Sequence, residues 1–214
     1  MDEKEKKYQE TFETWNKVAD LYQENFMHLD LYNDSYDLFC SMLSQQKPSI
    51  LEIGCGPGNI TQYLLSKKPE AKWLGIDIAA RMIELARINN PAAFFQVMDS
   101  RKLHQLTDQY DAIVAGFCIP YLSNEDCLIL YSEMYRLMQT GALLYMSFVA
   151  GDYNLSNFQT GSSGDRTYFY YHPIDGIKRE LMIRQFEICQ ELEITYNRKN
   201  GQAEIHTILI VKKQ

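Results

Sequence analysis

The sequence has too few basic residues for a typical nucleic-acid-binding protein. It also has no apolar run long enough for a membrane-spanning protein. Among 214 residues, 21 Lys and Arg stand against 28 Asp and Glu, so the net charge is −7 and the pI is near 5.1. Because proteins that bind nucleic acid usually present a basic face to the phosphates, this balance argues against a nucleic-acid partner. No hydrophobic run reaches the length of a membrane span, which argues against a membrane partner.

Paired cysteines and metal-binding spacings are also lacking. The five cysteines form no C-x-x-C pair, and the four histidines show no metal-ligand spacing, so we predict no metal. The first seven residues mix both charge signs and lack the apolar core of a signal peptide. We therefore expect a protein of the reducing cytoplasm.

The size and the hydrophobic content predict a single globular domain over residues 1–214. Hydrophobic residues make up 46% of the chain and charged residues 23%, which is enough for a full core. The oligomeric state does not follow from these numbers.

One stretch, residues 49–61, has the pattern of a ligand-binding loop. Ser49 to Ile53 is rich in branched apolar residues and is followed by Gly54, Gly56 and Gly58, and then by a helical pattern. The pattern predicts a strand, a tight loop and a helix. Glycines let such a loop adopt positive φ and approach a ligand, and the helix N-terminus points free N–H groups to the same place.

The spacing and one carboxylate indicate which ligand this is. A dinucleotide loop of the form G-x-G-x-x-G would need a glycine where Asn59 stands. Glu52 would repel a pyrophosphate but attract a sulfonium and an α-amino group, so the charge favours S-adenosylmethionine. The alternative for Glu52 is an acid at the sheet edge, paired with a lysine.

The run LEIGCGPGN, residues 51–59, resembles the first motif of the class I S-adenosylmethionine-dependent methyltransferases, and further matches follow in order. The resemblance implies a three-layer α/β/α Rossmann-like sheet, mostly parallel with a reversed last strand. It also implies transfer of a methyl group from S-adenosyl-L-methionine to a small-molecule acceptor, with S-adenosyl-L-homocysteine as product. A non-catalytic S-adenosylmethionine-binding protein would keep the same motifs, and a nicotinamide-dependent dehydrogenase is opposed by Asn59 and Glu52.

Two acids follow the second and third predicted strands. Asp77 lies 23 residues beyond Gly54, where an acid can accept hydrogen bonds from both ribose hydroxyls, or else cap the next helix. The resemblance implies that Asp99 binds the adenine amino group, whereas the alternative is an ion pair with Arg101 or Lys102. The full set of predicted cofactor-binding residues is Tyr22, Glu52, Gly54, Cys55, Gly56, Gly58, Asn59, Asp77, Ile78, Met82, Asp99, Ser100, Gly116 and Phe117.

Four segments are expected within the domain. Residues 1–45 form a helical cap, 46–150 the cofactor-binding core, 151–173 an insertion on the acceptor side, and 174–214 a closing helix and a hairpin around Asn200-Gly201. The cap has two helical stripes. The first contains Phe12, Trp15, Ala19, Tyr22 and Phe26, and it either packs as core or covers the cofactor, with Tyr22 as the lid residue.

No catalytic residue stands out. The motifs [N/D]-P-P-[F/Y] and Pro-Cys are missing, which argues against methylation of nucleic-acid bases. In-line displacement at a sulfonium carbon needs alignment and a dry pocket more than it needs an acid or a base. A hydroxyl acceptor would need a base, for which we name His172. The aromatic run from Tyr168 to His172, with Tyr121, either walls an acceptor site or packs as a hairpin on the sheet edge.

Overall fold

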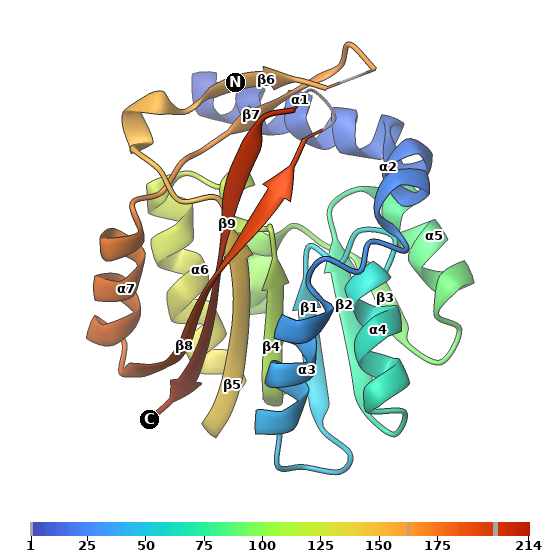
Figure 1. Cartoon of the computed structure of the whole chain (residues 1–214), viewed down its shortest axis with the longest axis vertical. Helices are drawn as coiled ribbons and strands as arrows, with labels where there is room; N and C mark the ends of the chain where they lie inside the picture. Colours follow the sequence, from blue (N-terminus) through green and yellow to red (C-terminus); the bar gives the residue numbers. More distant parts are fainter. Residues whose placement is uncertain (1, 162, 199–200) are drawn as a thin grey trace.

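A seven-stranded sheet with the strand order β3-β2-β1-β4-β5-β9-β8 forms the centre of the molecule (Figure 1). It is seen in a computed structural model that describes residues 2–161, 163–198 and 201–214. The strands are β1 (Ser49–Ile53), β2 (Lys72–Asp77), β3 (Phe94–Val97), β4 (Tyr110–Gly116), β5 (Met138–Phe148), β8 (Phe186–Asn197) and β9 (Ala203–Lys213). A separate hairpin pairs β6 (Asn157–Thr160) with β7 (Arg166–Phe169).

The sheet is mostly parallel. β1 pairs in parallel with β2 and β4, β2 with β3, and β4 with β5, whereas β9 runs antiparallel to both β5 and β8. The reversed last strand is therefore confirmed. Because parallel strands end at the same edge, the loops after β1, β2, β3 and β4 meet at one end of the sheet.

Helices cover both faces of the sheet. They are α1 (Glu3–Lys17), α2 (Ala19–Phe26), α3 (Asn33–Met42), α4 (Asn59–Lys67), α5 (Ala80–Asn89), α6 (Asn124–Leu137) and α7 (Ile174–Ile183), with short 3-10 helices at Ser100–Gln105, Ile119–Tyr121 and Tyr153–Leu155. Side chains of α3 and α4 pack with one face of the central strands, and side chains of α6 and α7 pack with the other. This gives the predicted three layers. None of these helices is long and apolar enough to cross a membrane.

Alternation along the strands explains why both faces are covered. In β5 the adjacent residues Leu144 and Tyr145 are both buried, and each belongs to a different one of the two core clusters. Since successive side chains of a strand point to opposite faces, a run of apolar residues needs helices on both sides. The segment 142–148 of β5 is buried throughout for this reason.

The cap differs from the prediction at one point. The first stripe was expected to form one helix, but α1 ends at Lys17 and α2 begins at Ala19, because Val18 has φ −94° and ψ 10°. Figure 1 shows α1, α2 and the β6–β7 hairpin together at the upper end of the sheet. At the C-terminal hairpin Gly201 has φ +83°, as a turn requires, while Asn200 lies outside the described residues.

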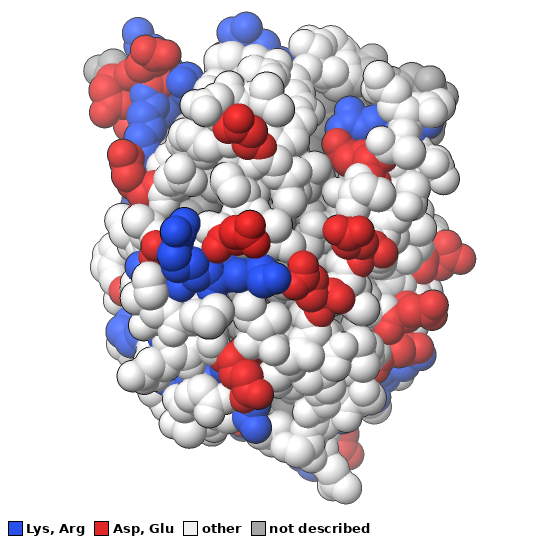
Figure 2. All heavy atoms as spheres, turned by 60° about the vertical axis from the view of Figure 1, so that its left-hand side comes forward, with Lys and Arg blue, Asp and Glu red and all other residues white. Residues whose placement is uncertain are grey.

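The surface mixes both charge signs on the face in front of α7 and β8. Figure 2 shows Lys and Arg side chains lying next to Asp and Glu there. Ion pairs of this region join Lys178 of α7 to Glu191 of β8 at 2.7 Å and Arg184, just after α7, to Glu180 at 2.6 Å.

Candidate functional site

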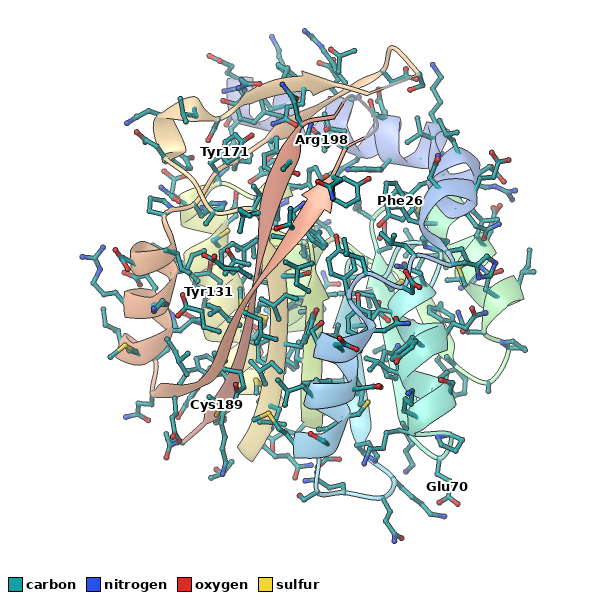
Figure 3. All side chains as sticks on the ribbon, in the orientation of Figure 1. Phe26, Glu70, Tyr131, Tyr171, Cys189 and Arg198 are labelled. Carbon is teal, nitrogen blue, oxygen red and sulfur yellow. The ribbon has the colours of Figure 1, made fainter. Side chains whose placement is uncertain are left out.

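A cavity of about 470 Å³ lies at the edge where the parallel strands end. Its walls come from the loops after β1 to β4, from α1 and α2, from the β6–β7 hairpin and from the adjoining ends of β8 and β9. Figure 3 shows Phe26 on α2 and Arg198 just beyond β8 at this same end of the sheet, and both line the cavity. Of the fourteen predicted cofactor-binding residues, all except Glu52 and Gly58 also line it.

The glycine loop is held by backbone hydrogen bonds. The N–H groups of Gly54 and Cys55 both donate to the carbonyl of Ile76, at 2.8 and 3.0 Å. Gly54 has φ +70° and Gly56 φ +53°, a region that side-chain-bearing residues rarely adopt. A Cβ on Gly56 would come no closer than 3.7 Å to the protein, where it would meet Tyr22. Space is therefore kept open above this glycine.

Asp77 is anchored at the centre of the site. Its Oδ2 accepts from the N–H of Gly56 and its Oδ1 from the N–H of Ala79, both at 2.9 Å. Burial raises the pKa of this carboxyl. Each carboxylate oxygen can accept a second hydrogen bond, so the anchored group can still bind two hydroxyls.

Asp99 takes part in an ion pair and also lines the cavity. The Arg101 guanidinium reaches it at 2.7 Å, and its Oδ1 also accepts from the backbone N–H of Arg101 at 2.9 Å. Arg101 lies over the ring of Tyr8, with its guanidinium carbon 4.3 Å from the ring centroid. The ion pair that we considered as an alternative is thus present, and it holds the carboxylate beside Ser100 at the cavity wall.

The other part of the cavity is aromatic. The Trp15 ring meets Tyr22 at 5.6 Å and Tyr121 at 5.2 Å, both edge to face, and Tyr121 meets Phe169 at 5.8 Å in the same way. The indole Nε1 of Trp15 is buried without a hydrogen-bond partner among the described residues. An unpaired buried N–H is costly, so this donor favours a ligand with an acceptor group.

Similarity to known proteins agrees with this geometry. Residues 50–141 match the family model described as a methyltransferase domain. The matches support a class I S-adenosylmethionine-dependent methyltransferase family for this chain.

Relatives of this methyltransferase family differ in what they act on. The chain is 28% identical over 137 residues to a putative methyltransferase of Invertebrate iridescent virus 6, covering 64% of the chain and 49% of that protein. It is 28% identical over 151 residues to a malonyl-[acyl-carrier protein] O-methyltransferase of Priestia megaterium, covering 69% and 52%. The chain spans about half the length of these curated relatives.

A solved member of the fold covers the whole chain. It is the 1,6-didemethyltoxoflavin-N1-methyltransferase of Burkholderia thailandensis, with bound 1,6-didemethyltoxoflavin and S-adenosylhomocysteine. The TM-score is 0.73 at 10% identity, with 100% of this chain and 92% of that chain covered. This similarity shows the shared methyltransferase fold.

The structure corrects the prediction for Glu52. Its side chain is 1% exposed and does not line the cavity, because its Oε2 accepts from the Thr61 hydroxyl and, at 3.1 Å, from Trp73 Nε1. Burial raises the pKa of Glu52 to about 8. Glu52 therefore joins β1 to α4 and β2. The paired lysine that we considered as an alternative is not its partner here.

Gly58 also has a different role from the one predicted. Its φ is +81°, and a Cβ there would lie 2.4 Å from Asn90 Nδ2 and 3.5 Å from Ala86. Asn90 donates to the carbonyl of Gly58 at 2.9 Å. This glycine allows the loop to pack closely against α5 and does not contact the cavity.

The interpretation of His172 as a base is wrong. Its side chain is buried outside the cavity, with Nε2 at 3.1 and 3.0 Å from the carbonyls of Ile119 and Leu122 and Nδ1 at 2.9 Å from Asn124 Oδ1. Burial lowers the pKa of this imidazole. His172 joins the end of the hairpin segment to the loop before α6.

His206 is the histidine that sequence reasoning missed. It lies on β9 and lines the cavity, with hydrogen bonds to Tyr32 and Glu204. A signal was available, because a reversed strand begins at the edge where parallel strands end. This rule could have placed the first residues of the strand 203–212 at the site, but His172 was named instead for its place in the aromatic run.

The residues of the aromatic run from Tyr168 to His172 serve both roles that we considered: some line the cavity and others pack in the core. Phe169 lines the cavity, and Tyr171 borders a neighbouring hollow together with Gln159 and Arg198. Tyr170 instead packs with Tyr8 at 6.4 Å, inside the core. The hairpin thus packs on α1 with one set of rings and walls the cavity with the other.

Proposed function

We propose that this chain transfers a methyl group from S-adenosylmethionine to a small-molecule acceptor. The observation that carries the proposal is the joint position of Asp77 and Gly56, at the start of a cavity that continues into an aromatic half. When bound, S-adenosylmethionine supplies an electrophilic methyl carbon on a sulfonium that is a good leaving group. The chain's own residues would bind, orient and dehydrate the reactants.

The residues present fit this cofactor. Asp77 has two oxygens with remaining acceptor capacity for the ribose hydroxyls, and Ile78 and Met82 supply apolar surface beside it for the adenine. The open space over Gly56 suits the methionine part. Asp99, held by Arg101, presents an acceptor to the amino group of adenine.

The acceptor that we propose is small and has an aromatic or apolar part. The rings of Trp15, Tyr121 and Phe169 form walls suited to such a molecule. The net charge of −7 and the mixed face of Figure 2 do not favour a nucleic-acid acceptor. Relatives named for malonyl-[acyl-carrier protein] and for 1,6-didemethyltoxoflavin are consistent with acceptors other than nucleic acid.

We also propose that residues 1–214 work as one domain in which the four predicted segments share this cavity. Residues 1–45 and 151–173 would cover the core, and the hairpin at 174–214 would complete the wall with β9.

The test is a calorimetric titration with S-adenosylmethionine and S-adenosylhomocysteine, followed by a mass-spectrometric screen of metabolites for a gain of one methyl group. Binding with methyl gain on a small molecule is the expected outcome. Binding with no methyl gain on any acceptor class would favour the non-catalytic alternative. Methylation of RNA, DNA or protein alone would contradict the proposed acceptor.

A further inference from the structure

A chain of hydrogen bonds leads from the cavity into the C-terminal hairpin. Tyr32 Oη lies 2.7 Å from His206 Nδ1, and His206 Nε2 lies 3.0 Å from Glu204 Oε2. Arg198 in turn donates to the other carboxylate oxygen of Glu204 at 2.5 Å. All four residues line the cavity.

The partners determine the proton positions in this chain. A carboxylate can only accept, so Nε2 of His206 carries the proton that Glu204 receives. Nδ1 of the neutral ring then has a free electron pair, and it accepts from the hydroxyl of Tyr32. The arrangement resembles the pairing of a base with an orienting acid that is common to catalytic histidines.

Packing holds the imidazole in one orientation. The His206 ring stacks on Tyr196 at 5.1 Å and on Tyr32 at 6.0 Å, and it meets Phe117 edge to face at 4.8 Å. Only 6% of His206 is exposed. Phe117 itself has φ +51°, a strained value for a residue with a side chain, and its N–H donates to the Ser147 carbonyl at 2.9 Å.

The charged groups beside the imidazole form an ion pair with each other. These groups are Glu204 and Arg198, and both His206 and Arg198 hold the pKa of the Glu204 carboxyl below its usual range. An ionised Glu204 stabilises an imidazolium. Burial raises the pKa of Tyr32, so its hydroxyl is a neutral donor at pH 7. The remaining titratable groups that raise the pKa of Tyr32 are other phenols, on α2, β5 and β8. These phenols are Tyr22, Tyr145 and Tyr196.

The chain stands on the acceptor side of the cavity. Among the predicted cofactor contacts, Gly56, Asp77 and Asp99 follow β1, β2 and β3, whereas Phe117 follows β4 and meets the His206 ring. His206 instead lies on β9, next to the end of β5, where Thr207 pairs with Phe148. Tyr32 and His206 therefore face the part of the cavity left for the second reactant.

We infer that Tyr32 and His206 form a proton relay for an acceptor whose nucleophilic oxygen carries a proton, namely an aromatic hydroxyl. The inference rests on the proposed function and names its substrate class. The acceptor O–H gives its proton to Tyr32 Oη as the proton of Tyr32 passes to His206 Nδ1. The electron pair of the broken O–H bond stays on the acceptor oxygen, which becomes the nucleophile, and the imidazolium is held by Glu204. Tyr32 is the catalytic residue here, and Glu204 is a positioning residue.

The test follows the ionisation of a bound phenol and does not depend on turnover. The protein is saturated with S-adenosylhomocysteine, nitrophenol is titrated in, and the absorbance of nitrophenolate is recorded against pH. In the wild type the bound probe should ionise at a pH about one unit or more below that of the free probe, which corresponds to a tenfold preference for the phenolate. His206→Gln and Tyr32→Phe should abolish the shift, and Glu204→Gln should reduce it.

The exposed His104 supplies the matched control, since His104→Gln should leave the shift unchanged. An equal shift in wild type and His206→Gln would overturn the relay, and so would no shift in the wild type. Failure of nitrophenol to bind to protein that holds S-adenosylhomocysteine would overturn the acceptor class while leaving the proposed function standing. Failure of S-adenosylhomocysteine to bind would instead overturn the proposed function.

Discussion

The backbone N–H of Gly56 donates a hydrogen bond of 2.9 Å to Oδ2 of Asp77. The contact joins the loop after β1 to the end of β2, two segments that each contribute to the cavity. Asp77 therefore serves both the ligand and the loop. A change at Asp77 should affect the shape of the glycine loop as well as the contacts that the carboxylate makes itself.

Asp77→Ala should weaken S-adenosylmethionine binding by about 1.5–3 kcal/mol, the range for hydrogen bonds to a charged group, which is roughly tenfold to a hundredfold in Kd. Calorimetric titration measures the effect. The exposed Asp108 provides the control, since Asp108→Ala removes an acid far from the cavity lining. Equal affinity in wild type and folded Asp77→Ala would remove Asp77 from the site.

Gly56→Val and Gly54→Val should abolish cofactor binding. Each substitution places a side chain at positive φ on the cavity wall, and at Gly54 the new Cβ would also lie 3.5 Å from the Cβ of Cys118. Gly164→Val is the matched control, because Gly164 has φ +83° with no atom within 4 Å of a Cβ. The Gly164→Val variant should lose about 1–2 kcal/mol of stability from the same backbone strain and should bind S-adenosylmethionine as tightly as wild type. Tight binding by a folded Gly56→Val protein would show that the loop is only a turn.

Tyr22→Ala should lower turnover more than it lowers cofactor affinity. Tyr22 stands beside the glycine loop in α2, next to Trp15 and Phe26, so its loss opens the cavity to water without removing a polar contact to the cofactor. Measured kcat and the calorimetric Kd separate the two effects. Parallel losses in both quantities would make Tyr22 a binding residue rather than a lid.

Removal of residues 1–17 should instead destabilise the fold. Tyr8 of α1 is 1% exposed, donates to Asp126 at 2.5 Å and accepts from the N–H of Ser123 at 2.8 Å. Deletion would remove the acceptor of the Ser123 N–H and expose core surface, at a cost of several kcal/mol. A thermal midpoint equal to that of the full chain would contradict this assignment of α1 to the core.

Glu52→Gln should change how stability depends on pH. The pKa of Glu52 is raised in the folded state, so its contribution to stability is present below about pH 4.5 and is lost as the pH rises through about 8. A neutral Gln can still accept from Thr61 and Trp73. The variant should therefore gain stability relative to wild type between pH 5 and 8, by a few kcal/mol at the upper end. Urea unfolding at several pH values gives the difference in the free energy of unfolding between Glu52→Gln and wild type. A difference that does not change with pH would contradict a raised pKa of Glu52.

Much of the cofactor half was predictable from the sequence because its determinants are local. Gly54 and Gly56, the acids Asp77 and Asp99 at strand ends, and the alternation of strand and helix are all patterns within short segments. Parallel strands end at one edge, so residues that follow different strands were expected to meet. Twelve of the fourteen residues line one cavity, and their contact with the cofactor stays a prediction.

Glu52 and Gly58 show where local reasoning fails. Both belong to the glycine motif, yet their surroundings come from other elements. Thr61 and Trp73 donate hydrogen bonds to the Glu52 carboxylate, and the Asn90 side chain fills the space beside Gly58. A sequence pattern does not state which way a side chain faces within a motif, because that depends on neighbours from α4, β2 and α5.

The sequence by itself indicated the fold class, a mostly parallel sheet with a reversed last strand, and the place where the cofactor is expected, because periodicity, glycine spacing and strand-end acids act over a few residues. Only the tertiary structure decided which histidine faces the cavity. Tyr32 and His206 are 174 residues apart, and they meet because β9 inserts antiparallel beside β5, whereas His172 is turned into the core by the carbonyls of Ile119 and Leu122. Contacts of that range depend on the packing of the whole sheet, which no local pattern encodes.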